Sequence, residues 1–210
     1  RWLWRDYPAP IRPAGPSQQL LASLLVPGEG WQLVGEGYRF TEGPAANAKG
    51  EVFFTDIPNN RIHKVGLDGK VSVFKEDTGS ANGLMFGPDG KLYACQNGRK
   101  RIVAYDMDSK ETIVAEGLDS NDLTMTHKGE IYVSDPPNKQ VWFINAKHEK
   151  RVVDTGIARP NGVLLAPDQS LLLVADSAGQ MVYSFQIQPD GSLAHTQPYY
   201  HLHLADTATQ

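Results

Sequence analysis

The stretch Thr41-Glu42-Gly43-Pro44, followed by the run Glu51-Val52-Phe53-Phe54-Thr55-Asp56, is the first of four similar units along this chain of 210 residues. Each later unit also begins with a polar residue ahead of a run rich in β-branched, aromatic and other apolar side chains. The residues equivalent to Glu42 are Asn82, Asn121 and Asn161, at successive intervals of 40, 39 and 40 residues. The chain is therefore a repeat array.

A second anchor in each unit gives the same period. The third run of every unit opens with a polar residue followed by an apolar one, again at intervals of 40, 39 and 40 residues. These pairs are Arg61-Ile62, Arg101-Ile102, Gln140-Val141 and Gln180-Met181. Each unit holds about four short runs separated by Gly, Asn, Asp or Pro, and strand-like runs that repeat every ~40 residues are typical of propeller blades. We expect an all-β protein, a β-propeller with four-stranded blades.

Composition narrows the class of protein. The chain is 40% hydrophobic, enough for a substantial core, and its net charge is −4 with Lys and Arg scattered singly or in short groups. This charge pattern argues against nucleic-acid and membrane partners. The apolar run from Leu20 to Val26 is far shorter than the ~20 residues of a membrane-spanning helix. The single cysteine, Cys95, excludes an intrachain disulfide framework. We expect a soluble protein, with cytoplasmic and periplasmic or secreted locations left open.

The start of the chain differs from the repeats. Residues 1–18 carry three aromatic residues and four prolines, which predicts an extended arm or linker, with a disordered lead-in as the alternative. We assign residues 19–210 to the propeller. The first residue is Arg1 and not Met, which suggests excision from a longer polypeptide, with room for another domain upstream.

The run Trp31 to Val34 precedes Glu42 by the same distance that last-strand runs precede the later units. We therefore expect it to be the last strand of a blade whose other three strands follow Gln210, because propellers often close by such a strand exchange. On this interpretation a C-terminal portion is absent. The alternative is a self-contained ring of four blades.

The equivalent positions define a candidate site. The first strands of propeller blades line the central channel and run in one direction, so the side chains of Glu42, Asn82, Asn121 and Asn161 are expected to converge. One carboxylate and three carboxamides suit a hard cation, most simply Ca²⁺, with Mg²⁺, Mn²⁺ or Zn²⁺ as alternatives, although no His or Cys is aligned as zinc prefers. The competing interpretation is that Asn before Gly only adopts a left-handed or turn conformation.

Three motifs carry a resemblance to a known family: Glu42-Gly43-Pro44 with the run behind it, Asn82-Gly83-Leu84, and Pro160-Asn161-Gly162. Between about Trp31 and Tyr200 the chain resembles the gluconolactonase, senescence-marker-protein and luciferin-regenerating-enzyme family of six-bladed propellers. The resemblance implies four visible blades of six, a divalent cation and hydrolysis of a sugar lactone or related cyclic ester. It also implies that Glu42 and Asn161 bind the metal, and that Asn121 binds either the metal or the substrate.

The chain departs from the family pattern in two ways. The family's fourth ligand, an Asp in an Asp-Gly motif that is also thought to act as the base, would lie beyond Gln210. One branch of the family has an Arg two residues before the Asn that matches Asn121, whereas this chain has Asp119 there, so its substrate is expected to differ from the usual sugar lactone. Asp122 is the candidate catalytic residue within the chain, as a base or as support for a ligand, with turn capping as the alternative. Asn82 is expected to line the pocket and contact the substrate.

Other polar residues favour structural roles. We expect the aspartates that close the second run of three units to accept backbone hydrogen bonds, Cys95 to be buried, and the three isolated histidines to lie at the surface. The aspartates are Asp56, Asp135 and Asp176, and the histidines are His63, His127 and His148. The pair His201 and His203 is expected on a solvated edge strand.

Two other functions compete with a metal-dependent lactone hydrolase. One is a non-catalytic propeller that binds a protein or glycan partner, because a propeller fold alone decides no function. The other is a metal-dependent hydrolase of another ester or of a phosphotriester. Glu and Asn at the equivalent positions favour a metal, whereas a pure binding module would more often present aromatic or Arg residues there.

Overall fold

The computed structural model describes residues 32–202. The chain divides into two units, Arg1–Leu33 and Val34–Gln210, and every described strand belongs to the second unit. The arm expected at residues 1–18 lies outside the described residues. Within residues 32–202, no helix has the length and apolarity needed to cross a membrane.

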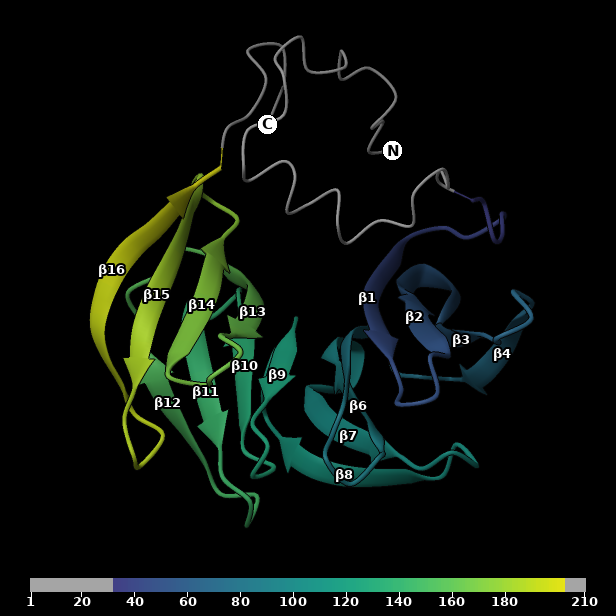
Figure 1. The fold of residues 1–210 in the computed structure, drawn as a ribbon, viewed down its shortest axis with the longest axis horizontal. Coiled ribbons are helices and arrows are strands. Elements are labelled where there is room, and N and C mark those ends of the chain that lie inside the picture. Colours follow the sequence, from purple (N-terminus) through teal and green to yellow (C-terminus); the bar gives the residue numbers. More distant parts are fainter. Residues whose placement is uncertain (1–31, 203–210) are drawn as a thin grey trace, which may run out of the picture. The chain divides into compact units, whose positions relative to one another are not determined.

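The described residues form sixteen strands in four antiparallel sheets, each made of four consecutive strands paired in chain order (Figure 1). This confirms the expected all-β propeller with four-stranded blades. The first sheet contains β1 (Thr41–Ala46), β2 (Val52–Asp56), β3 (Arg61–Val65) and β4 (Val71–Glu76); the second contains β5 (Ala81–Phe86), β6 (Leu92–Gln96), β7 (Arg101–Tyr105) and β8 (Glu111–Glu116). The third contains β9 (Leu123–Met125), β10 (Ile131–Asp135), β11 (Gln140–Ile144) and β12 (Lys150–Asp154); the fourth contains β13 (Pro160–Leu165), β14 (Leu171–Asp176), β15 (Met181–Ile187) and β16 (Leu193–His201).

The strand expected at Trp31 to Val34 stays a prediction, because its partner strands were expected after Gln210 and Trp31 lies outside the described residues. Residues 32–34 adopt no strand, and the side chains of Leu33 and Val34 are 77% and 54% exposed. A strand needs a neighbour that satisfies its backbone N–H and C=O groups, and no strand within residues 32–202 pairs with this segment.

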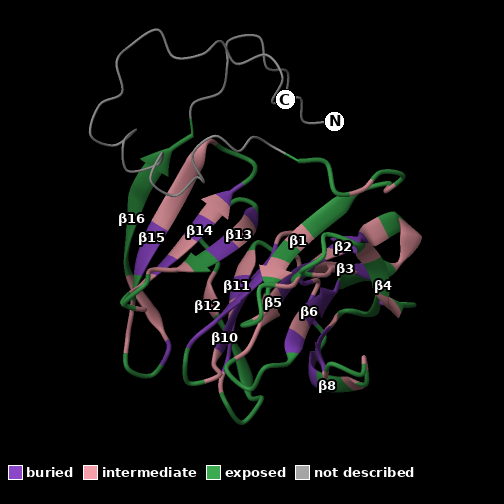
Figure 2. Cartoon of the chain, turned by 45° about the vertical axis from the view of Figure 1, so that its right-hand side comes forward, coloured by how far each residue is buried: buried purple, intermediate pink, exposed green. Residues whose placement is uncertain are grey.

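Three apolar clusters hold the four sheets together, one for each pair of consecutive sheets. Between the first and second sheets, the ring of Phe53 meets the rings of Phe74 and Phe86 edge to face at 5.1 Å. Side chains alternate across a strand, so Ala94 on β6 packs toward the first sheet while Cys95 packs toward the third. Figure 2 shows buried residues in purple on the strands of the inner sheets, whereas β16 is largely exposed. The expectation that Cys95 is buried is confirmed.

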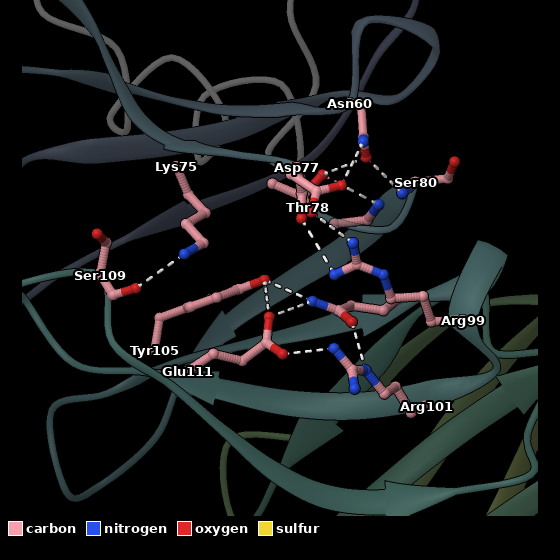
Figure 3. A network of polar contacts seen from close by, with 12 residues as sticks. Asn60, Lys75, Asp77, Thr78, Ser80, Arg99, Arg101, Tyr105, Ser109 and Glu111 are labelled. Carbon is pink, nitrogen blue, oxygen red and sulfur yellow. Dashed lines mark hydrogen bonds and ion pairs between the residues drawn. The ribbon is translucent and has the colours of Figure 1, made fainter.

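A polar network lies within the second sheet (Figure 3). Glu111 on β8 forms an ion pair with Arg101 on β7 and accepts hydrogen bonds from Gln96 Nε2 at 2.7 Å and from the Tyr105 hydroxyl at 3.0 Å. Gln96 Oε1 in turn accepts a hydrogen bond from Arg101 Nε at 2.6 Å. Gln96 and Tyr105 are fully buried. Because these buried polar groups find partners in one another, the network stabilises the sheet without leaving them desolvated and unpaired.

Candidate functional site

The four equivalent polar residues line a single cavity of about 470 Å³. Glu42 lies on β1, Asn82 on β5 and Asn161 on β13, while Asn121 lies two residues before β9. Consecutive first strands are neighbours in space, β1 beside β5, β5 beside β9 and β9 beside β13. The repeat register therefore brings one polar residue from each unit to the same cavity.

A β-bulge occurs at the polar residue in three of the four units. The pairing of the first strand with the second shifts register between Glu42 and Ala45, between Ala81 and Leu84, and between Pro160 and Val163. A bulge bends its strand and re-aims the side chains within it, and bulges are frequent at functional sites. The glycine that follows the polar residue in each of these units was the sequence signal for this feature.

Two of these glycines also allow the first strands to approach closely. Gly43 has a φ of +52°, and a Cβ there would lie 2.9 Å from the backbone of Gly83. A Cβ on Gly83 would lie 2.7 Å from Asp122 Cα and 2.9 Å from the carbonyl oxygen of Asn121. That carbonyl accepts a hydrogen bond from the Gly83 N–H at 2.9 Å, so the second and third sheets are joined by backbone at the cavity wall.

Thr55 makes a similar connection between the first and second sheets. Its buried hydroxyl lies 3.0 Å from the Glu42 carbonyl and 3.1 Å from the Asn82 carbonyl. The backbones that carry the first two site residues are thus held together while their side chains stay available.

The side chains of Glu42, Asn82, Asn121 and Asn161 form no hydrogen bond or ion pair with any residue between 32 and 202. Glu42 is exposed and the three asparagines are half-buried. None of these three asparagines has a positive φ, and Asn82 and Asn161 lie within strands, so a left-handed or turn conformation does not explain them. One carboxylate and three amide groups line one cavity without partners among the described residues, and their oxygens fit a hard cation.

This set of donor atoms is less suited to Zn²⁺ than to Ca²⁺, because Zn²⁺ prefers His and Cys ligands. Within the described part of the chain, no group of three or more His, Cys, Asp and Glu side chains could hold a metal ion. A cation in this cavity would therefore depend on amide oxygens together with Glu42, a pattern closer to Ca²⁺ than to Zn²⁺.

Asp122 lines the same cavity but its carboxylate is already engaged. Oδ1 accepts a hydrogen bond from the Leu123 N–H at 2.9 Å, and Oδ2 accepts one from the Val163 N–H at 3.1 Å. Burial raises the pKa of Asp122 above its ordinary value and the carboxylate of Glu42 raises it further, while the two amides oppose the shift. Asp122 therefore has a structural role, because it accepts hydrogen bonds from the backbone, and it also lies beside the candidate ligands.

The three aspartates at the ends of second strands accept backbone hydrogen bonds, as expected. Asp56 accepts from the amides of residues 39 and 40, Asp135 from that of Asp119, and Asp176 from that of Arg159 at 3.0 Å. Each donor lies two or three residues before the site residue of its own unit. These aspartates therefore fix the segments that lead into the site.

The expectation for the histidines is partly wrong. His127 and His148 are exposed, but His63 is only 8% exposed and its Nε2 has no hydrogen-bond partner among the described residues. Its ring stacks on Phe54 at 5.2 Å and meets Tyr38 edge to face at 5.0 Å, which explains the burial. His201 ends β16, an edge strand as expected, whereas His203 lies outside the described residues.

The chain is 24% identical over 198 residues to a gluconolactonase of Zymomonas mobilis subsp. mobilis, an alignment that covers 76% of this chain and 56% of that protein. The chain thus spans little more than half the length of this curated relative.

Solved structures share the fold. A gluconolactonase from Xanthomonas campestris superposes with a TM-score of 0.73 at 21% identity, covering 79% of this chain and 64% of that one. The calcium-binding protein regucalcin from Agrobacterium tumefaciens gives a TM-score of 0.64 at 18% identity, covering 77% of this chain and 59% of that one. At these identities the similarity establishes a common propeller fold.

The family profile covers most of the chain. The SMP-30/Gluconolactonase/LRE-like region matches residues 40–207, a span that includes all four sheets and the cavity they share. The motifs that carried the resemblance in the sequence lie within this match. The chain belongs to the SMP-30/gluconolactonase/LRE-like family.

Proposed function

We propose that the protein hydrolyses a lactone in the cavity shared by the four first strands, with the help of a divalent cation. The observation that carries the proposal is the lining of one cavity by Glu42, Asn82, Asn121 and Asn161, whose side chains have no partners within the described residues. Family membership supports the reaction class.

Residue roles follow from position and donor chemistry. Glu42, Asn121 and Asn161 would hold the cation, with Ca²⁺ favoured by the oxygen-only donor set. A cation bound there would polarise the lactone carbonyl and stabilise the oxyanion that develops on it. Asn82 and Asn121 would contact the substrate, since amide groups donate to and accept from sugar hydroxyls.

Asp122 is the candidate acid–base residue of the described chain. Its raised pKa favours proton uptake nearer neutrality than for an ordinary carboxylate, and its position beside Asn121 allows it to support that ligand. The bonds that Asp122 makes to Leu123 and Val163 also orient it. We propose that it holds the wall of the cavity and assists the proton transfer that accompanies attack by water.

The experiment is a titrimetric assay of lactone hydrolysis by the intact protein with Ca²⁺, and again after removal of metal by a chelator. The proposal predicts turnover of a sugar lactone that is lost on chelation and restored by Ca²⁺, and lost in the Glu42→Gln variant. A well-folded protein that hydrolyses no lactone, with or without cation, would instead support a propeller that binds a partner without catalysis.

A further inference from the structure

A second, smaller cavity of about 180 Å³ adjoins the candidate site. Asn82, Asn121 and Asn161 line both cavities, so these three side chains lie between them. The polar lining of the smaller cavity is completed by Ser80, Asn97 and Arg159. A substrate that contacts Asn82 and Asn121 in the larger cavity can therefore extend a substituent into the smaller one.

The smaller cavity carries an unbalanced positive charge. Arg159 is exposed, and its guanidinium forms no hydrogen bond or ion pair with any residue from 32 to 202. No carboxylate lines this cavity within that range. The other polar groups there are amides and a hydroxyl, which can donate hydrogen bonds; the Asn97 amide already donates one to the Ser120 carbonyl at 3.1 Å. Such a set suits an anion, because a guanidinium can bind a carboxylate through two parallel N–H···O bonds.

The neighbouring acids do not compensate Arg159. Asp119 occupies the equivalent position in the preceding unit, but it forms an ion pair with Lys100 at 3.1 Å and accepts a hydrogen bond from Asn138 at 3.2 Å. Asp176 accepts the backbone N–H of Arg159. Among residues 32–202 the guanidinium therefore has no acidic partner, which leaves its positive charge available to a ligand.

The backbone of Arg159 is fixed on both sides. Its N–H donates to Asp176 Oδ1 at 3.0 Å, and its carbonyl accepts from the Ser177 N–H at 3.0 Å and from the Ser177 hydroxyl at 3.2 Å. Pro160 follows and restricts the backbone of Arg159 further. Because the backbone of Arg159 is already ordered, ligand binding does not have to order it, and the conformational entropy lost on binding is smaller. Arg159 is therefore suited to select a substrate.

We infer that Arg159 is a specificity-determining residue and that the substrate is an anionic lactone, whose carboxylate substituent binds in the smaller cavity while its ester lies in the larger one. The inference rests on the proposed hydrolase function for the position of the ester. The carboxylate subsite itself rests on the lining of the smaller cavity.

Two lactones with the same ring provide the test. D-glucaro-1,4-lactone carries a carboxylate at the carbon where D-glucono-1,4-lactone carries a neutral hydroxymethyl group. We expect the intact protein to prefer the anionic lactone in kcat/KM, and the Arg159→Gln variant to lose at least about tenfold of that preference. Arg159→Lys keeps the positive charge but cannot form the bidentate hydrogen bonds of a guanidinium. It should therefore keep only part of the preference for the anionic lactone.

The control is Lys70→Gln, which removes one exposed positive charge from the turn between β3 and β4 and lies outside both cavities. It should leave the ratio of the two kcat/KM values unchanged. If the protein hydrolyses both lactones and Arg159→Gln leaves their ratio unchanged, the inference is overturned while the hydrolase proposal stands.

Binding measurements separate the two proposals. If the protein hydrolyses neither lactone, the hydrolase proposal fails, and calorimetric titration with D-glucarate and D-gluconate decides the subsite. Tighter binding of the dicarboxylate that disappears in Arg159→Gln supports the subsite. Equal binding of the two, or a preference that survives the substitution, contradicts it.

Discussion

The carboxylate of Asp122 joins two blades at the wall of the cavity, because its Oδ2 accepts the backbone N–H of Val163 at 3.1 Å. Its other oxygen accepts the N–H of Leu123, the residue that begins β9. The candidate acid–base residue is thus also a link between the third and fourth sheets, and substitutions there should affect both stability and activity.

Asp122→Ala should lower the free energy of unfolding by about 2 kcal/mol, since it leaves two backbone amides without their charged acceptor. Asp122→Asn, which keeps one acceptor oxygen, should cost less. Urea denaturation measures both. Asp168→Ala is the control, because Asp168 makes only exposed hydrogen bonds to Ser170 and should cost less than either. If Asp122→Ala is as stable as the wild type, the hydrogen bonds of Asp122 to Leu123 and Val163 contribute nothing to the free energy of unfolding.

Gly83→Ala should destabilise the protein by about 1–3 kcal/mol, because the new Cβ meets backbone of Asn121 and Asp122 within 3 Å and the adjoining strands must move apart. Gly162→Ala is the matched control in the fourth unit, where the nearest atom to a Cβ is 3.9 Å away. It should stay near wild-type stability. Thermal unfolding of the two variants compares them, and equal losses would contradict the close-approach explanation.

Glu111→Ala should cost about 3 kcal/mol, since it leaves Arg101, Gln96 and Tyr105 without a shared acceptor in a mostly buried setting. Glu76→Ala is the control. It breaks the ion pair with Arg61. The side chains of Glu76 and Arg61 are 67% and 46% exposed, so the substitution should lower the free energy of unfolding by less than about 1 kcal/mol. Chemical denaturation tests the difference, and similar losses would mean that burial of the network is unimportant.

Burial lowers the pKa of His63 below its ordinary value of 6.5, while the carboxylate of Asp56 opposes this shift and Arg61 adds to it. The unfolded chain therefore binds a proton more readily than the folded one. Stability should be full above pH 6.5 and should decrease as the pH falls from 6.5 toward the lower pKa of the folded state. Unfolding midpoints between pH 5 and 8 for wild type and His63→Leu measure this. The variant should lose that part of the pH dependence, and an unchanged profile would contradict the assignment.

Much of the architecture was predictable because the repeat is strict. Two anchors at intervals of 40, 39 and 40 residues fix which residues are equivalent, and equivalent residues in a propeller must occupy equivalent places. This is why Glu42 and Asn161, far apart in sequence, could be expected at one cavity. The period also located the strands. The burial of Cys95 was expected because it ends a strand and no His or Asn is patterned around it as for a nucleophile.

The sequence could not supply the contacts between units. The link from Asp122 to Val163 joins residues of different blades, and nothing local to either one indicates it. His63 was expected at the surface because its position is not repeated, but Phe54 and Tyr38 cover it. Residues 32–34 form no strand within the described chain, and the strand predicted at Trp31 to Val34 stays a prediction because its partners were expected after Gln210.

The role of Arg159 was also hidden in the sequence. Its position before Pro160 and Asn161 marks it as adjacent to a site residue, but many arginines form surface ion pairs. Only the lining of the smaller cavity and the pairing of Asp119 with Lys100 distinguish it from those. Arg159 thus places a positive charge in the fourth unit, whereas one branch of the family has its Arg in the third unit, at the position of Asp119.

The most direct test of the central claim is the effect of Ca²⁺ on the melting temperature of the intact protein after chelation of bound metal. A cation held by Glu42, Asn121 and Asn161 stabilises the folded state by mass action, so the melting temperature should rise with Ca²⁺ concentration, and Asn161→Ala should abolish the rise. A melting temperature that is independent of Ca²⁺, or a rise that persists in Asn161→Ala, would contradict it.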